Sequence, residues 1–333
     1  MTDFIPIRGY ATFDPLRHCW VGSGFEWEWF QDLEIAREDR IMSPLKRIAE
    51  ETEEDYQRLC DILRSAGVTC HRSHLDMTRY SSLHDVWRPP VNPRDHFAVI
   101  GETLYATSEA QGYGDVLRRC DPSTVHIDTR SIPVSTAVLV RVGRDVWWDI
   151  PHDCQPQHAE EYVARWRQDG FRVHTSHRGY HSDAVFCVVR PGCIVSLMDI
   201  QDYHQEFPGW DVMYLPDQGH ELMWPWQTMK SRVGRRWWLK GEDHNHQLIN
   251  FVNTWLTDWV GYAEETVFDV NMLSIDHNTI ICNNYNKEVF AHFRKHGVEP
   301  IIFNFRHRWF WDGGVHCITQ DLYREGEQTD YFA

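Results

Sequence analysis

The 333-residue sequence predicts a closed α/β ring of five similar units. An apolar strand, a short turn with glycine or polar residues and a second apolar strand occur together five times along the chain. β-branched and aromatic runs that are broken by Gly, Asp or Asn are typical of β-hairpins. At least three of the copies continue into a helix and a further strand, which makes the unit strand, strand, helix, strand. The alternative is an ordinary α+β domain with several hairpins.

The hairpins are predicted from runs rich in Val, Ile, Leu, Phe and Trp. They fall at residues 18–22 with their continuation, 96–106, 137–148, 184–195 and 270–282. Three amphipathic segments follow hairpins, and each ends at a glycine, which favours a left-handed helix C-cap. These helices are predicted at residues 44–66 before Gly67, 159–169 before Gly170 and 287–296 before Gly297.

A tryptophan-rich segment, at about residues 217–266, does not follow the repeated strand, strand, helix, strand pattern. Its residues 247–260 have a helical pattern. The segment either covers a functional site, joins the subunits of a homo-oligomer, or simply adds a structural helix. The domain prediction is a single α/β domain over residues 1–333 that carries this insertion.

Composition restricts the function classes. Apolar residues make up 42% and charged residues 25% of the chain, as in soluble globular proteins. No run of about 18 apolar residues predicts a membrane span, and the first residues do not resemble a secretion signal. Nine scattered cysteines without a Cys-x-x-Cys pair favour free thiols in a reducing, cytoplasmic compartment.

The net charge of −16 argues against a nucleic-acid partner, because binding to phosphates depends on clustered Lys and Arg. A cationic small molecule is favoured, although salt screens this long-range attraction.

The segment around Cys317 has the most distinctive local sequence. Gly313 and Gly314 precede the thiol and allow the backbone and a substrate to come close together. Taken alone, a cysteine in such a strand is more often a buried core residue than a nucleophile.

Further motifs change this balance. Residues 313–319, Gly-Gly-Val-His-Cys-Ile-Thr, followed by Asp321, Arg324 and Gly326, resemble the nucleophile segment of the arginine:glycine amidinotransferase family. Other motifs of that family follow in its order and cover most of the chain outside the insertion. They are Phe-Asp-Pro-Leu at 13–16, Pro-Arg-Asp at 93–95, Gly-Arg-Asp at 143–145 and His-Ser-Asp at 181–183.

The resemblance implies a five-bladed α/β propeller, the pentein fold, with the site at the centre of the ring. It implies that Cys317 is the nucleophile and that Asp95 and Asp183 bind a guanidinium group. It also implies that His181 is the general acid and base, with Asp145 as the carboxylate that orients it. Carboxylates suit a planar, permanently charged guanidinium, and a nearby cation favours the thiolate.

The implied reaction moves an amidino group from a guanidino donor, arginine or a related compound, to an acceptor amine through a covalent intermediate on the cysteine. Asp321, Arg324 and Gly326 favour this transferase. The alternatives are a deiminase or dihydrolase, in which water replaces the amine, and an inactive scaffold that only binds its ligand.

Two features of substrate recognition depart from the family pattern. Ile200 replaces an arginine that binds the donor carboxylate, and Glu264-Glu265 replace a pair of serines. A decarboxylated or otherwise cationic donor therefore becomes plausible. The implied two-step displacement needs no cofactor. No metal is predicted either, because the histidine-rich patches 152–154 and 244–246 have no partner at ligand spacing.

Overall fold

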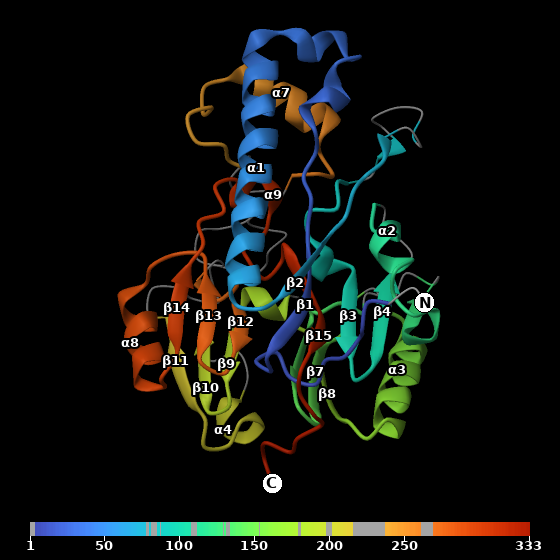
Figure 1. Ribbon diagram of the computed structural model, residues 1–333, viewed down its shortest axis with the longest axis vertical. Helices are drawn as coiled ribbons and strands as arrows, with labels where there is room; N and C mark the ends of the chain where they lie inside the picture. The colour runs from blue at the N-terminus through green and yellow to red at the C-terminus, as the bar shows by residue number, and fades with distance from the viewer. Residues whose placement is uncertain are drawn as a thin grey trace.

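The computed structural model describes residues 4–77, 80, 85–86, 88–107, 112–128, 130, 134–152, 154–178, 181–197, 202–215, 237–260 and 269–333, and the structural statements below concern these residues. Five three-stranded sheets follow one another along the chain and are flanked by helices (Figure 1). This architecture confirms the predicted fold class.

The sheets share one pattern, in which the middle strand pairs antiparallel with one neighbour and parallel with the other. In chain order from the second sheet, they contain β3 (Phe97–Ile100), β4 (Thr103–Thr107) and β5 (Val125–Asp128); β6 (Leu139–Val142), β7 (Asp145–Asp149) and β8 (Arg172–Ser176); β9 (Phe186–Arg190), β10 (Cys193–Ser196) and β11 (Asp211–Tyr214); and β12 (Leu273–Asp276), β13 (Thr279–Cys282) and β14 (Glu299–Ile302).

The first sheet departs from the expected local hairpin. It consists of β1 (Leu16–Val21), β2 (Thr69–Arg72) and the last strand of the chain, β15 (Thr319–Arg324). β15 pairs antiparallel with β1 and takes the place that the first strand of the hairpin has in the other units. The two ends of the repeat therefore complete one sheet together.

Each sheet contacts the next one in the series, and the last sheet contacts the first. β15 lies against β3, and Arg141 of β6 donates to the Val99 carbonyl of β3. β6 contacts the 3-10 helix η7 (Ser182–Ala184) that precedes β9, β9 contacts β12, and β12 contacts β1. The sheets therefore form a closed circuit with β3, β6, β9, β12 and β15 on its inner side.

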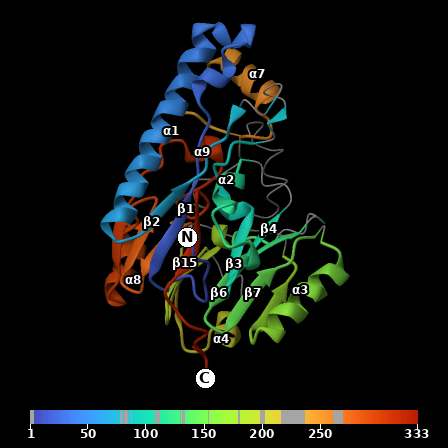
Figure 2. The ribbon, with the colours of Figure 1, turned by 45° about the vertical axis from the view of Figure 1, so that its right-hand side comes forward.

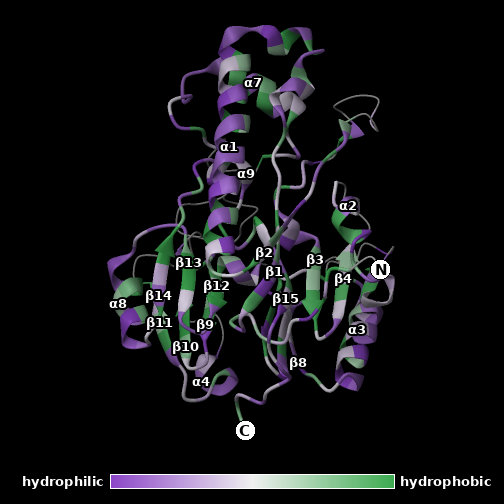
Figure 3. Ribbon diagram, viewed as in Figure 1, coloured by the Kyte–Doolittle hydropathy of each residue, from purple (hydrophilic) through white to green (hydrophobic). Residues whose placement is uncertain are grey.

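Helices connect the second and third strands of each unit. They are α1 (Asp39–Ser65), α2 (Gly114–Leu117), α3 (Pro156–Gln168), α4 (Tyr203–Glu206) and α8 (Lys287–Lys295). The three predicted helices are confirmed, and the glycines that follow α1, α3 and α8 have φ values of 79°, 89° and 68°. In Figure 3 the strands are mostly hydrophobic, whereas α1, α3 and α8 also carry hydrophilic residues.

The long helix α1 extends beyond the ring together with α7 (His246–Trp255) (Figures 1 and 2). α7 belongs to the tryptophan-rich insertion and packs against α1. Asn245 donates to the Arg40 carbonyl at 2.7 Å, and Trp259 donates to the Val86 carbonyl at 3.2 Å. Trp224, Trp226 and the Glu264-Glu265 pair lie outside the described residues.

None of the helices described is long and apolar enough to cross a membrane. All nine cysteines are free thiols in this structure.

Candidate active site

Polar side chains converge at the end of the ring where the inner strands begin. Asp95 lies two residues before β3, Asp183 three before β9, Asn271 two before β12 and Cys317 two before β15. Asn271 Nδ2 donates to Cys317 Sγ at 3.0 Å, and Cys317 Sγ lies 3.5 Å from Asp183 Oδ2. Four units of the repeat therefore each place one polar side chain in this cluster.

The backbone around Cys317 is held tightly on both sides. Arg94 N–H donates to the Cys317 carbonyl at 3.3 Å, and Cys317 N–H donates to Asn271 Oδ1 at 3.3 Å. A Cβ atom at Gly314 would lie 2.5 Å from Asn271 Oδ1, so only glycine permits this close approach. Asp312 has φ 55°, an uncommon conformation for a residue with a side chain.

Cys317 is buried, and its environment opposes formation of the thiolate. Burial raises the pKa of the Cys317 thiol well above its usual value, and the charges of Asp183, Asp95 and Asp312 raise it further. The hydrogen bond from Asn271 acts in the opposite direction. Without a cation in the site, the thiol is therefore protonated at neutral pH.

Asp183 combines one bound oxygen with one free oxygen. Its Oδ2 lies 2.8 Å from His316 Nδ1 and accepts from Asn271 at 3.2 Å, whereas Oδ1 is buried without a hydrogen-bond partner among the described residues. Burial favours the neutral acid, but the His316 hydrogen bond and nearby positive charges outweigh it and lower the pKa of Asp183. The carboxylate is therefore ionised and can accept a further donor.

Asp95 occupies the matching position before β3, in the 3-10 helix η5 (Pro93–Asp95). Burial raises the pKa of Asp95 to about 6; His181 and Arg88 oppose the shift, whereas Asp183 and Asp312 add to it. Asp95 Oδ1 is also buried and makes no hydrogen bond to the described part of the chain. Asp95 Oδ1 and Asp183 Oδ1 can therefore each accept a hydrogen bond from a ligand in the site.

His181 stands directly before η7 and is exposed. When protonated, its ring interacts electrostatically with both Asp95 and Asp183, two carboxylates that also act on the thiol. His316, whose pKa is lowered by burial and by Arg94, contacts Asp183 Oδ2 through its Nδ1. Two histidines therefore lie around the carboxylates, one exposed and one partly buried.

The structure does not bring Asp145 to this site, which corrects the prediction that it orients His181. Asp145 is the first residue of β7 and pairs with Val142 at the far end of β6. A five-residue strand spans roughly 13 Å, so Asp145 lies about that far from the end where Cys317 lies. Its carboxylate instead binds Arg172 at 2.6 Å and His174 at 2.8 Å. The third unit therefore adds no polar side chain to the cluster from the equivalent position, because the residue two places before its inner strand β6 is Ala137.

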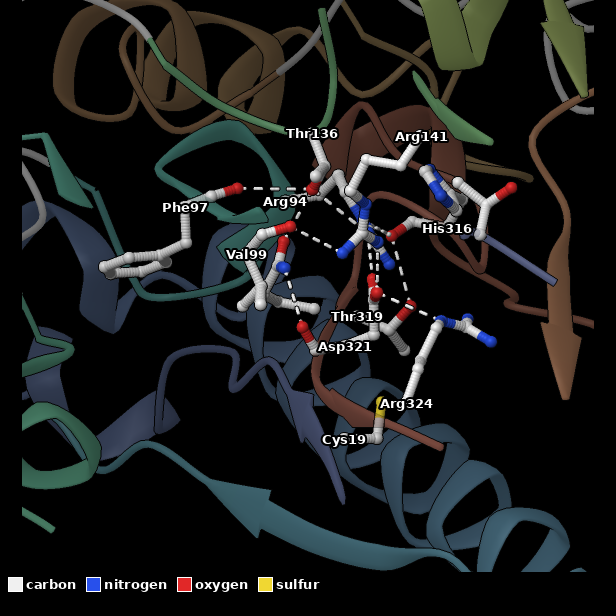
Figure 4. A network of polar contacts seen from close by, with 12 residues as sticks. Cys19, Arg94, Phe97, Val99, Thr136, Arg141, His316, Thr319, Asp321 and Arg324 are labelled. Carbon is white, nitrogen blue, oxygen red and sulfur yellow. Dashed lines mark hydrogen bonds and ion pairs between the residues drawn. The ribbon is translucent and has the colours of Figure 1, made fainter. Parts of the chain in front are cut away.

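A buried ion network lies beneath the nucleophile segment (Figure 4). Asp321 binds Arg94 at 2.5 Å and Arg324 at 3.0 Å, and it also binds Arg141. Arg94 additionally donates to the His316 carbonyl at 3.1 Å, which connects the network to the residue before Cys317.

These contacts explain three residues that the sequence comparison associated with transferases. Asp321 and Arg324 tie strands together inside the ring, and a Cβ at Gly326 would lie 2.0 Å from Asp14 Oδ2. Their roles are structural, so they no longer favour transfer over hydrolysis.

Sequence reasoning missed Asn271, His316 and Asp312 as members of the site. Alignment of the five repeats would have found Asn271, because it has the same position before β12 as Cys317 has before β15. His316 and Asp312 are neighbours of Cys317 in the sequence, but their types alone did not indicate their contacts. Ile200 lies outside the described residues.

A group of metal-ligating residue types occurs at another place, where Cys193, His292 and His296 lie together. Cys193 begins β10, at the far end of the fourth sheet from Asp183. This group is therefore separate from the thiol site.

No protein-family model and no curated protein sequence matches the chain. Solved structures do match. SxtG, an amidinotransferase from Microseira wollei in the saxitoxin biosynthetic pathway, superposes with a TM-score of 0.67 at 18% identity, covering 98% of this chain and 100% of that one. The inosamine-phosphate amidinotransferase StrB1 from Streptomyces griseus gives 0.64 at 16% identity, covering 98% and 99%.

A hydrolase is also similar. The dimethylarginine dimethylaminohydrolase (DDAH) from Pseudomonas aeruginosa superposes with a TM-score of 0.55 at 10% identity, covering 92% of this chain and 98% of that one. The chain therefore has the five-unit α/β pentein fold that these amidinotransferases share with a dimethylarginine hydrolase.

Proposed function

We propose that the chain is an amidinotransferase in which Cys317 takes an amidino group from a guanidino donor and passes it to an amine, with residues 1–333 acting as one catalytic domain. The observation that carries the proposal is the pair of unpartnered carboxylate oxygens, Asp95 Oδ1 and Asp183 Oδ1, in the cluster around the buried thiol. A guanidinium offers a planar array of N–H donors and a positive charge, which is what these oxygens lack.

Binding of the donor also counteracts the raised pKa of the Cys317 thiol. The same negative charges that raise the pKa of Cys317 are neutralised when a guanidinium occupies the site. The substrate cation therefore lowers the thiol pKa at the moment when the thiolate is needed.

The cycle balances in two displacements. His181 accepts the thiol proton as Cys317 Sγ bonds to the guanidino carbon, and it returns that proton to the leaving amine as the carbon–nitrogen bond breaks. An amidino-thioether cation remains on Cys317. An acceptor amine then bonds to the same carbon, loses a proton to His181 and displaces the thiolate, which recovers the proton. Asp95 and Asp183 hold the cation throughout.

Hydrolysis by the same residues is the second candidate. It is favoured by the similarity to the dimethylarginine hydrolase, and the structural roles of Asp321, Arg324 and Gly326 do not argue against it. The higher TM-scores of the two amidinotransferases support transfer. An inactive binding scaffold would need a missing nucleophile or missing carboxylates, and Cys317, Asp95 and Asp183 are all in place.

The binding carboxylates give the first prediction. D95N and D183N are each expected to lower kcat/KM for guanidino donors about 10- to 150-fold, because each removes a charge-assisted hydrogen bond worth about 1.5–3 kcal/mol. D61N, on an exposed part of α1, is the control that should leave kcat/KM unchanged. Wild-type kinetics in both active-site variants would refute their assignment to the guanidinium.

The pH profile gives a second prediction for Asp95. Since its pKa is about 6, we expect kcat/KM of the wild type to fall as the pH drops through that value, because the protonated acid has lost its charge. The ionised form is disfavoured in the fold, so D95N should not lower the melting temperature at pH 7. The acidic limb near pH 6 should disappear in D95N, and its persistence there would assign it to another group.

Decay of the covalent adduct separates transfer from hydrolysis. The adduct on Cys317 is formed with donor alone, excess donor is removed, and its lifetime is followed by mass spectrometry with and without glycine, lysine or ornithine. We expect an amine to shorten the lifetime and to yield a new guanidino compound. If no amine does so while urea or a ureido product accumulates, the chain is a hydrolase and the transferase proposal fails.

A further inference from the structure

We propose that Cys193, His292 and His296 form a structural site for a zinc-like divalent metal ion that joins the fourth and fifth sheets of the ring. The ligand atoms of these three side chains all lie within 4.8 Å of one another. Sulfur and imidazole ligands are the combination that Zn²⁺ and Co²⁺ prefer in proteins. The site is remote from Cys317 and independent of the proposed reaction.

The secondary structure positions the three ligands. His292 lies in α8 and His296 caps its end one turn later, so both side chains are on one face of the helix. Cys193 begins β10 in the neighbouring unit and is fully buried. α8 packs onto β10 through the apolar cluster that contains Val289, Phe293 and Cys193.

One ring nitrogen of His292 is buried in this cluster and is available to a ligand. The His292 side chain is only 8% exposed; its ring has a hydrogen bond with the backbone of Ile194, and its Nε2 has no partner of ordinary hydrogen-bond geometry within the described residues. Buried polar atoms are normally satisfied, and an unsatisfied one costs about 1–3 kcal/mol. A metal ion bound to the imidazole would supply that partner.

Asp211 completes the charge balance. It pairs with Cys193 across the parallel strands β10 and β11, so the two side chains share one face of the sheet. Asp211 Oδ2 lies 2.8 Å from His296 Nε2 and 3.9 Å from His292 Nδ1. A metal-bound cysteine thiolate and this carboxylate together neutralise a divalent cation, and a carboxylate beside a ligating histidine orients its ring.

The distances fit a site that tightens when it is filled. Tetrahedral zinc with bonds of about 2.0–2.3 Å places its ligand atoms roughly 3.3–3.6 Å apart. Side-chain rotations that move the ligand atoms by about 1 Å would therefore bring them to the separation found in a zinc site. Lys295, which is exposed and bonds Asp211 at 2.5 Å, must turn into solvent when the cation binds, and the Cys193 thiol releases its proton.

Cobalt binding tests the proposal, because Co²⁺ bound to a thiolate gives a characteristic charge-transfer absorption. The protein is stripped with a chelator and titrated with Co²⁺ and, in parallel, with Zn²⁺. We use C317S to remove the thiol of the candidate active site, and C187S as the control for a cysteine that packs against the same apolar cluster as Cys193. The wild type, C317S and C187S should each bind about one ion with the thiolate band.

C193S should lose the thiolate band, and H296Q should weaken binding strongly, with circular dichroism confirming that both variants are folded. D211N should weaken it about 10- to 100-fold. Chelation should lower the melting temperature of the wild type and C317S but not of C193S. A thiolate band that persists in C193S, or that is absent from folded wild type, would overturn the proposal. Loss of guanidino chemistry in C317S with cobalt binding intact would separate the two proposals.

Discussion

C317S is expected to abolish turnover of guanidino donors, with kcat falling at least about a thousandfold, while the fold is preserved. The buried thiol is protonated in the free protein, because burial and three carboxylates raise its pKa. A serine hydroxyl therefore replaces a neutral group of similar shape and can keep the hydrogen bond from Asn271. The change removes only the group that becomes the attacking thiolate.

The control for this variant is C120S, which changes a buried thiol in the apolar cluster that contains Val116 and Leu104 and should retain full activity. The melting temperature of C317S should stay close to that of the wild type, and it should still bind a guanidino donor. Retention of activity within about tenfold in folded C317S would remove Cys317 from the mechanism.

D321N is expected to destabilise the protein by about 3–5 kcal/mol, because it leaves three buried arginines without their shared carboxylate. Asp321, Arg94, Arg141 and Arg324 are each at most 2% exposed as side chains. For a chain of this size, such a loss lowers the melting temperature by about 4–7 °C. The measurement is thermal unfolding of D321N beside wild type at pH 7.

The matched control is E325Q, which breaks an exposed ion pair with Arg17 and should hardly change the melting temperature. Burial alone would raise the pKa of Asp321, but Arg141, Arg324 and Arg94 outweigh it and hold the pKa well below its usual value. The stabilisation is therefore present above about pH 4 and is lost as the pH falls further. An unchanged melting temperature in D321N would show that the network does not hold the ring together.

The local parts of the fold could be predicted from sequence because they depend on neighbouring residues. Apolar runs broken by short turns indicated the hairpins, and Gly67, Gly170 and Gly297 marked the helix ends. The first sheet could not be predicted in the same way, because Val21 pairs with Thr319 and no local pattern specifies that partner.

The same limit applies to the site. Cys317, Asp183 and Asp95 were predicted and lie in one cluster, since each precedes an inner strand of its unit. Asp145 was predicted from a Gly-Arg-Asp motif, but that motif forms the turn between β6 and β7 at the opposite end of the ring. A motif in a single sequence identifies residue types and does not say at which end of a strand they function.

Intact-protein mass spectrometry after rapid acid quenching tests the central claim most directly. The protein is mixed briefly with arginine, with a decarboxylated guanidino amine or with methylated guanidines, and then digested to locate any modification. We predict a mass increase of one amidino group on Cys317, absent from C317S and reduced in D183N. A folded protein that forms no adduct with any guanidino donor, or that carries the group on another residue, would contradict the account.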